Sequence, residues 1–248
     1  MEHILSSIQD DAIIVSFLNK KYMKMFKLFY TYISKFQLEN IVIVCLDNYS
    51  FTALKMYNVK PILFEYNIDH RESFWRFRLE KILEFLETSK KNIIHTDLDC
   101  FWFRDIYSDL LKRTNFQYDL IGHVAHKMPN YVAQELGFVL CCGLFMIRYS
   151  PDNVAWVKAI MAEYPTIEDD QVLFNHYILH HKTTITTLPN SYNITKVIKM
   201  DNNKSIGMIN PKLISRNYYG FDSMYGFHPH LRSPDMKEKI REFHHFFQ

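Results

Sequence analysis

Two hydrophobic patterns alternate through the first half of the chain. Apolar positions that recur every three or four residues predict helices over residues 22–36 and about 71–87. Continuous apolar runs between them are typical of strands buried in a sheet. This alternation predicts a mainly parallel sheet with helices on both faces. The predicted strands cover residues 12–18, 41–46, 61–64 and 93–96, and Ser50 is expected to cap a short helix through residue 56.

The second half of the chain has a less regular pattern. Apolar runs at residues 119–124 and 138–148 predict two more strands. Helices are expected over residues 151–164 and 169–180, the first opened by a proline. Beyond Pro189 we expect short strands and loops, then a charged tail helix from about residue 234. Because no repeat, low-complexity stretch or linker interrupts the chain, we expect a single domain over residues 1–248.

Glycine is scarce, which excludes two common phosphate-binding loops. The chain has six glycines in 248 residues, and none precedes Gly122. The dinucleotide fingerprint and the P-loop both place glycines just after a strand near the N-terminus. Any nucleotide must therefore be held by other means. The net charge of +2 gives no strong field for nucleic acid, so no nucleic-acid partner is expected.

The cysteines and the N-terminus bear on the cellular setting. The four cysteines show no CxxC spacing, so we expect reduced, buried thiols and neither a zinc site nor a disulfide framework. The N-terminus lacks a basic region followed by an apolar stretch, and no run of 18 apolar residues occurs. These features predict a cytoplasmic protein without a membrane span.

Two aspartates follow the fourth predicted strand, where residues 92–105 read NIIHTDLDCFWFRD. Alternation along an extended chain places Asp97 and Asp99 on one face at the carboxyl end of this strand. Ligands of open α/β sheets bind at that edge. Neighbouring carboxylates repel each other unless a cation joins them, and oxygen ligands suit Mg²⁺ or Mn²⁺. The pattern favours a divalent-cation site that holds phosphates; a pair of solvated or capping aspartates is the alternative interpretation.

With these residues in view, the sequence resembles the DxD-containing nucleotide-diphospho-sugar transferases, a GT-A family that includes plant rhamnogalacturonan xylosyltransferases. The resemblance rests on residues 78–105, on the strand 41–47 with its terminal aspartate, on CGLFM at 142–146, and on DQVLFN at 170–175. It implies a GT-A type α/β fold with a single Rossmann-like, mainly parallel sheet flanked by helices and a mixed C-terminal part. The nucleotide-binding half would span about residues 12–105 and the acceptor-side half about 106–248.

The resemblance also implies roles for particular residues. Asp97 and Asp99 would bind the metal and the donor diphosphate, with His228 or His230 as a further metal ligand. Asp47, Arg78 and Lys81 would contact the nucleotide or its phosphates, although a turn aspartate and a solvated helix face are equally compatible with the pattern. Gly143 would leave room for the acceptor or donor sugar. Asp170, Asp169 and Gln171 would lie near the acceptor, with helix capping as the alternative for the two aspartates.

These roles predict a metal-dependent glycosyltransferase that uses Mn²⁺ or Mg²⁺. A nucleotide sugar, UDP- or GDP-linked, would donate its sugar to a hydroxyl of a glycan or glycoprotein. The resemblance implies retention of configuration, whereas inversion would require Asp170 or Asp169 as a base. One alternative is a Mg²⁺-dependent phosphatase of the DxDx(T/V) kind, although Phe101 stands where Thr or Val is needed. Another is a non-catalytic sugar- or protein-binding module on the same fold.

Overall fold

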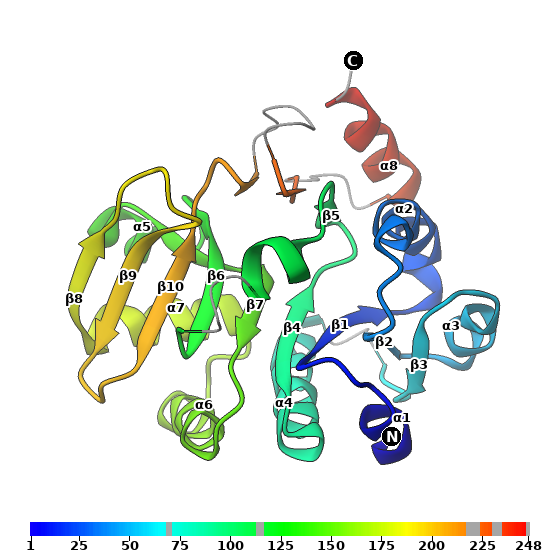
Figure 1. The fold of residues 1–248 in the computed structure, drawn as a ribbon, viewed down its shortest axis with the longest axis horizontal. Coiled ribbons are helices and arrows are strands. Elements are labelled where there is room, and N and C mark those ends of the chain that lie inside the picture. The colour runs from blue at the N-terminus through cyan, green and yellow to red at the C-terminus, as the bar shows by residue number, and fades with distance from the viewer. Residues whose placement is uncertain (68–70, 113–116, 217–223, 230–234, 247–248) are drawn as a thin grey trace.

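A nine-stranded sheet forms the centre of the protein in its computed structural model (Figure 1), which describes residues 1–67, 71–112, 117–216, 224–229 and 235–246. The strand order is β3-β2-β1-β4-β7-β6-β10-β9-β8, and β7 and β9 run opposite to the other strands. The strands are β1 (Ala12–Leu18), β2 (Ile41–Cys45), β3 (Lys60–Leu63), β4 (Asn92–Thr96), β6 (Leu120–Ala125), β7 (Val139–Ile147), β8 (Lys182–Thr187), β9 (Ile194–Met200) and β10 (Ser205–Ile209).

Helices cover both faces of the sheet because alternate strand residues point to opposite sides. On one face, Ile13 and Val15 pack with apolar residues of α4 (Arg71–Ser89), α6 (Pro151–Glu163) and α7 (Asp170–His181). On the other, Ile14 packs with α2 (Met23–Ile33) and α8 (Met236–His245). The shorter helices are α1 (Glu2–Ser6), α3 (Asn48–Ala53) and α5 (Asn130–Leu136), with 3-10 turns at Lys20–Tyr22, Ser34–Phe36 and Leu54–Met56 and a π-helix at Ile106–Leu111.

The structure confirms the predicted fold class and most predicted elements. One expectation about a cap is wrong: Asp47, not Ser50, caps α3, because its carboxylate accepts the backbone N–H of Ser50. Strand β8 and helix α5 were not predicted. Strand β8 lies at the edge of the sheet and is largely exposed, so it lacks the apolar run of a buried strand. Among the residues that the structure describes, no helix is both long and apolar enough to cross a membrane.

A second, three-stranded sheet brings the C-terminal part of the chain over the carboxyl end of β4. It contains β5 (Phe101–Trp102), β12 (Gly226–Phe227) and β11 (Ile214–Ser215), in the order β11-β12-β5. Strands β5 and β12 are antiparallel, and Phe101 pairs with Phe227. This register places the residue after β12, His228, beside the aspartates that precede β5.

Candidate functional site

Asp97 and Asp99 lie at the carboxyl end of β4, as predicted. The backbone N–H of Asp97 donates to the carbonyl of Gly143 at 2.7 Å, which continues the pairing of β4 with β7 by one residue. Their side chains are 31% and 24% exposed, respectively. Both carboxylates are therefore held by a rigid sheet edge and remain accessible to a ligand.

Arg78 of α4 joins Asp97 to Asp170 of α7. Its Nη1 donates to Asp97 Oδ1 at 2.8 Å, and its Nε and Nη2 donate to the two carboxylate oxygens of Asp170 at 2.8 and 2.7 Å. Arg78 and Asp170 are both buried. Burial opposes ionisation of Asp97, but the charge of Arg78 outweighs it and holds the pKa of Asp97 well below its usual range. Asp97 is therefore a carboxylate at neutral pH.

His95 of β4 contacts the same carboxylate of Asp97. Its Nε2 lies 3.1 Å from Asp97 Oδ1. Burial and the nearby charge of Arg78 lower the pKa of His95, so the ring is neutral. Because an ionised carboxylate only accepts hydrogen bonds, the proton of the neutral ring lies on Nε2.

His228 and the two aspartates together form a set of candidate metal ligands. Its Nε2 lies 3.3 Å from Asp99 Oδ1 and 3.8 Å from Asp97 Oδ2, and the three candidate ligand atoms all lie within 4.8 Å of one another. Burial and Arg216 oppose protonation, but hydrogen bonding to Asp99 and Cys141 outweighs them and raises the pKa of His228 to about 9. Two carboxylates and one imidazole fit a divalent cation such as Mn²⁺.

The space beside Gly143 is filled by the ring of His228. A Cβ atom at position 143 would meet His228 Cε1 at 1.9 Å, so the ring would have to move to admit any side chain. The expectation that this glycine leaves room for a sugar stays a prediction, since the imidazole takes the space directly beside it. The missing side chain allows the imidazole to approach β7 closely.

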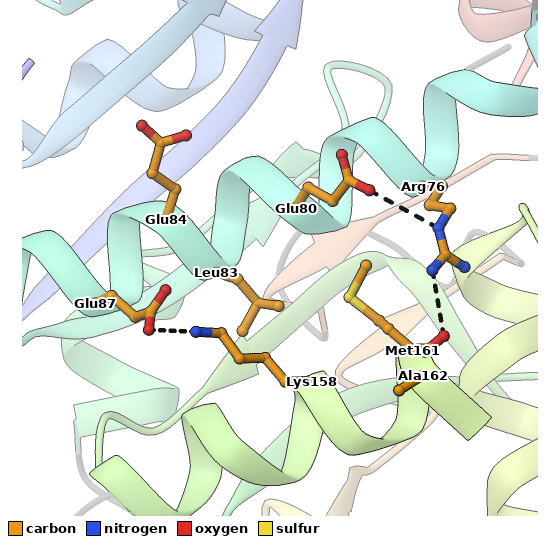
Figure 2. Close-up of a pocket in the computed structure, with 8 residues that line it drawn as sticks. All are labelled: Arg76, Glu80, Leu83, Glu84, Glu87, Lys158, Met161 and Ala162. Carbon is orange, nitrogen blue, oxygen red and sulfur yellow. Dashed lines mark hydrogen bonds and ion pairs between the residues drawn. The ribbon is translucent and has the colours of Figure 1, made fainter. Parts of the chain in front are cut away.

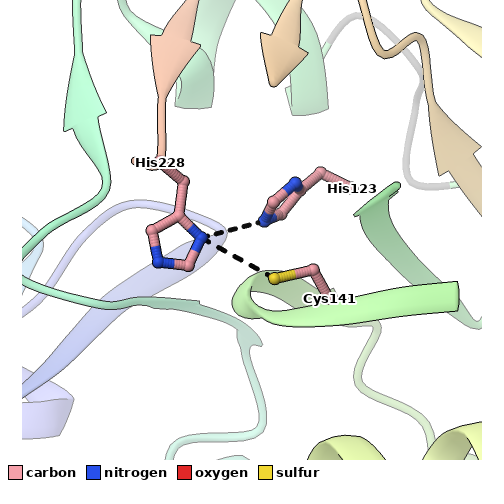
Figure 3. Close-up of side chains that lie close together, drawn as sticks. All are labelled: His123, Cys141 and His228. Atoms are coloured by element: carbon pink, nitrogen blue, oxygen red, sulfur yellow. Dashed lines mark hydrogen bonds between the residues drawn. The ribbon is translucent and has the colours of Figure 1, made fainter. Parts of the chain in front are cut away.

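The other nitrogen of His228 faces a second group of polar atoms (Figure 3). His228 Nδ1 lies 3.2 Å from His123 Nε2 and 3.7 Å from Cys141 Sγ. Arg216 Nη2 donates to the same sulfur at 3.1 Å. Sequence reasoning missed His123, Cys141 and Arg216. A histidine inside the apolar run of residues 120–125 was the one signal that could have drawn attention to this group.

Comparison with known proteins assigns the chain to a protein family. A family model described as nucleotide-diphospho-sugar transferase matches residues 37–218. The chain belongs to the nucleotide-diphospho-sugar transferase family. This membership confirms the predicted family and the predicted enzyme class, glycosyltransferase. No curated protein sequence matches the chain.

Solved structures share the fold of this transferase at low sequence identity. A glycosyltransferase involved in the glycosylation of the major capsid of PBCV-1 superposes with a TM-score of 0.54 and 10% identity, over 95% of this chain and 98% of that one. A CMP:2-keto-3-deoxy-manno-octonic acid synthetase in complex with CTP gives 0.50 and 10%, over 96% and 98%. Mouse xyloside xylosyltransferase 1 gives 0.46 and 12%, over 90% and 99%. At these identities the first two likenesses concern the fold alone, and a TM-score of 0.46 does not show a shared fold.

The DQVLFN segment of the transferase fastens α7 to β7. Gln171 Oε1 accepts the backbone N–H of Cys142 at 3.1 Å, and its Nε2 donates to the carbonyl of Met128 at 2.6 Å. One turn later, Asn175 both accepts from and donates to the backbone of Leu140, at 2.8 and 2.7 Å. Asp169 caps the helix through the N–H of Val172 at 2.9 Å. These contacts hold β7 in place beside the candidate metal ligands Asp97, Asp99 and His228.

Two predicted nucleotide-binding residues make contacts elsewhere. Lys81 pairs with Glu84 at 2.7 Å, and its ammonium lies 4.4 Å from the centre of the Phe64 ring. Asp47 accepts the backbone N–H groups of Ser50 and Lys20 at 2.7 and 2.6 Å. Both roles stay predictions. His230 lies outside the described residues.

A groove between α4 and α6 lies apart from these residues (Figure 2). Two contacts connect its sides. Lys158 Nζ lies 2.5 Å from Glu87 Oε1, and Arg76 Nη2 donates to the carbonyl oxygen of Met161 at 3.2 Å. None of its eight lining residues belongs to the predicted site. We therefore place the candidate site at the carboxyl end of β4, between Arg78 and His228.

Proposed function

We propose that the protein is a divalent-cation-dependent glycosyltransferase that moves a sugar from a nucleotide diphosphate to an acceptor hydroxyl. The observation that carries this proposal is the convergence of Asp97, Asp99 and His228 at the sheet edge. In a chain without glycine-rich phosphate loops, a cation at this point gives a diphosphate its binding partner. We expect Mn²⁺ or Mg²⁺, and a UDP- or GDP-linked sugar as donor.

The chain's own residues prepare the carboxylates for this role. The bidentate pair with Asp170 fixes the guanidinium of Arg78, and Arg78 in turn orients Asp97 and keeps it ionised. His95 donates a second hydrogen bond to the same oxygen. Such outer contacts typically strengthen metal binding by about 10–100-fold. When bound, the cation offsets negative charge that develops on the leaving nucleoside diphosphate.

We further propose that the anomeric configuration of the sugar is retained. Inversion needs a free carboxylate opposite the leaving group, and Asp170 and Asp169 were its candidates. Both oxygens of Asp170 accept from Arg78, and Asp169 accepts the N–H of Val172. With these carboxylates engaged, a departing phosphate oxygen takes the proton of the acceptor hydroxyl. NMR assignment of the product anomer tests this; an inverted product would contradict it.

A turnover assay tests the proposed activity. We would screen a panel of UDP- and GDP-sugars by thermal shift with Mn²⁺, then measure release of the nucleoside diphosphate with a glycan acceptor. We expect turnover that EDTA abolishes, that Mn²⁺ restores and that Asp99→Asn loses. Phosphate release from a phosphomonoester would instead identify a phosphatase. Donor binding without either reaction would identify a binding module.

A further inference from the structure

The ring of His228 separates two different sets of donor atoms. Its Nε2 faces the oxygens of Asp97 and Asp99, whereas its Nδ1 faces a thiol sulfur and an imidazole nitrogen. His123, Cys141 and His228 are all buried, and their ligand atoms lie within 4.8 Å of one another. His123 and Cys141 have no part in the proposed sugar transfer.

The spacing of this second group fits a small tetrahedral metal ion. Zinc bonds of about 2.0–2.1 Å to nitrogen and 2.3 Å to sulfur place two nitrogens about 3.3 Å apart and a nitrogen about 3.6 Å from a sulfur. The observed distances from His228 Nδ1 are 3.2 Å to the nitrogen of His123 and 3.7 Å to the sulfur of Cys141. Figure 3 shows the three side chains pointing toward a common centre from three separate segments.

We propose that His123, Cys141 and His228 Nδ1 form a second metal site that binds Zn²⁺. One thiolate and two neutral imidazoles form a donor set that binds Zn²⁺ in preference to Mg²⁺ or Mn²⁺. Binding needs a thiolate and neutral imidazoles, so it releases to solvent the second proton of the His228 imidazolium and any proton on the Cys141 thiol. Spacing among the four cysteines could not reveal such a site, because it uses a single cysteine and two histidines that are distant in sequence.

The sheet holds two of the three ligands before any ion arrives. His123 of β6 and Cys141 of β7 are direct partners in the antiparallel register, so their side chains share one face. Ligands on adjacent strands are positioned more accurately than ligands on loops. Arg216 donates to the sulfur of Cys141 at 3.1 Å, which is the kind of outer contact that orients a ligating thiolate.

The two metal sites compete for His228. A neutral imidazole offers one lone pair, so a ring that ligates zinc through Nδ1 carries its proton on Nε2 and donates it toward Asp99. It then has no lone pair for the cation beside the aspartates. Zinc should therefore inhibit sugar transfer supported by Mn²⁺; this consequence rests on the proposed function, whereas the zinc site itself does not.

The binding test uses Co²⁺ as a spectroscopic probe and Zn²⁺ as its competitor. With the full chain we expect a near-ultraviolet thiolate-to-Co²⁺ absorption band that one equivalent of Zn²⁺ abolishes. Cys141→Ser should remove this band and weaken Zn²⁺ binding at least about 100-fold, since loss of a ligand exceeds loss of an outer contact. Cys142→Ser is the matched control. The thiol of Cys142 is also buried but lies in a different core cluster from that of Cys141, so the band should persist in this variant.

Three outcomes would overturn the zinc site. The first is wild-type protein without a thiolate band; the second is a band that Cys142→Ser removes and Cys141→Ser does not. The third is Zn²⁺ binding that survives Cys141→Ser and disappears in Asp99→Asn, which would place the ion among the carboxylates. These readouts need no enzymatic activity, so failure of the proposed transfer leaves them intact. In a working assay, Zn²⁺ inhibition should be at least about 10-fold weaker in Cys141→Ser, relative to that variant's own rate with Mn²⁺.

Discussion

The two sides of the His228 ring differ in chemistry and in access. On the Nε2 side, Asp97 and Asp99 offer hard oxygen atoms, and their side chains are 31% and 24% exposed. On the Nδ1 side, His123 and Cys141 offer nitrogen and sulfur, and both residues are 0% exposed. The partly exposed carboxylates are accessible to a cation that carries a diphosphate. The fully buried side is closed to a substrate, which can therefore reach only one side of this histidine.

The comparison also shows how one side chain can link two sites. Each ring nitrogen of His228 faces a different set of partners, and the position of its proton decides which side can bind a metal. The glycine at position 143 is what allows the ring to occupy this place. Substitutions on the carboxylate side, then in its buried support, and finally at the ring itself can break this comparison.

The largest effect is expected on the carboxylate side. Asp99→Asn removes the charge of a proposed metal ligand, and we expect turnover to fall about 10²–10³-fold, the range for loss of one electrostatic stabiliser. Asp105→Asn is the matched control, because Asp105 caps the π-helix through the N–H of Ser108 at 3.0 Å and asparagine caps equally well. Steady-state kinetics with Mn²⁺ measures the turnover of both variants. Equal losses in the two variants would contradict the assignment of Asp99.

The next effect concerns the buried support behind Asp97. Asp170→Ala leaves the guanidinium of Arg78 without its bidentate partner, which should lower the free energy of unfolding by about 3–5 kcal/mol. The adjacent Asp169→Asn only exchanges one good helix cap for another and should cost less than about 1 kcal/mol. Urea denaturation of both variants provides the comparison. Similar unfolding free energies would show that the Arg78 pair does not stabilise the fold.

A smaller effect is expected when the ring is displaced. Gly143→Ala places a methyl group where His228 Cε1 lies, so the ring must move and Mn²⁺ affinity should fall about 10–100-fold. In the control, Gly122→Ala, the new methyl meets the side chain of Leu140 instead. That variant should lose stability while keeping its Mn²⁺ affinity, as measured by electron paramagnetic resonance titration. Unchanged Mn²⁺ affinity in Gly143→Ala would contradict the ligand role of His228.

The smallest effect is a dependence of metal binding on pH. The pKa of His228 is raised to about 9, so below this pH the free protein carries a proton that a cation must displace from Nε2. The association constant for Mn²⁺ should therefore rise by about tenfold per pH unit between pH 7 and 8.5. His228→Gln should bind more weakly and lose most of this slope. A slope near zero in the wild type would show that His228 binds no cation.

The sequence predicts the carboxylate side better than the buried side, for a physical reason. Asp97 and Asp99 follow a buried strand, so local patterning alone places them together at the edge of the sheet. His123 and Cys141 meet only through the pairing of β6 with β7, and neither stands in a motif. A single sequence reveals strands more readily than it reveals their register.

Long-range ion pairs are equally hidden from local pattern. Arg78 and Lys81 looked alike as phosphate ligands on one helical face, yet Arg78 is buried against Asp170, 92 residues away, while Lys81 pairs with Glu84. Asp170, whose place near the acceptor stays a prediction, accepts hydrogen bonds from Arg78 with both of its oxygens. The sequence pattern thus placed both charged residues on one face of a helix. Only the packing of α4 against α7 decided which partner each of them has.

The most direct measurement of the central claim is anomalous diffraction from crystals soaked with Mn²⁺ and a nucleoside diphosphate. The account predicts one strong manganese peak within bonding distance of Asp99, Asp97 and His228 Nε2, with the diphosphate oxygens on its exposed side. A manganese peak bonded to Cys141 and His123, or a nucleotide bound in the groove between α4 and α6 without a metal, would contradict it.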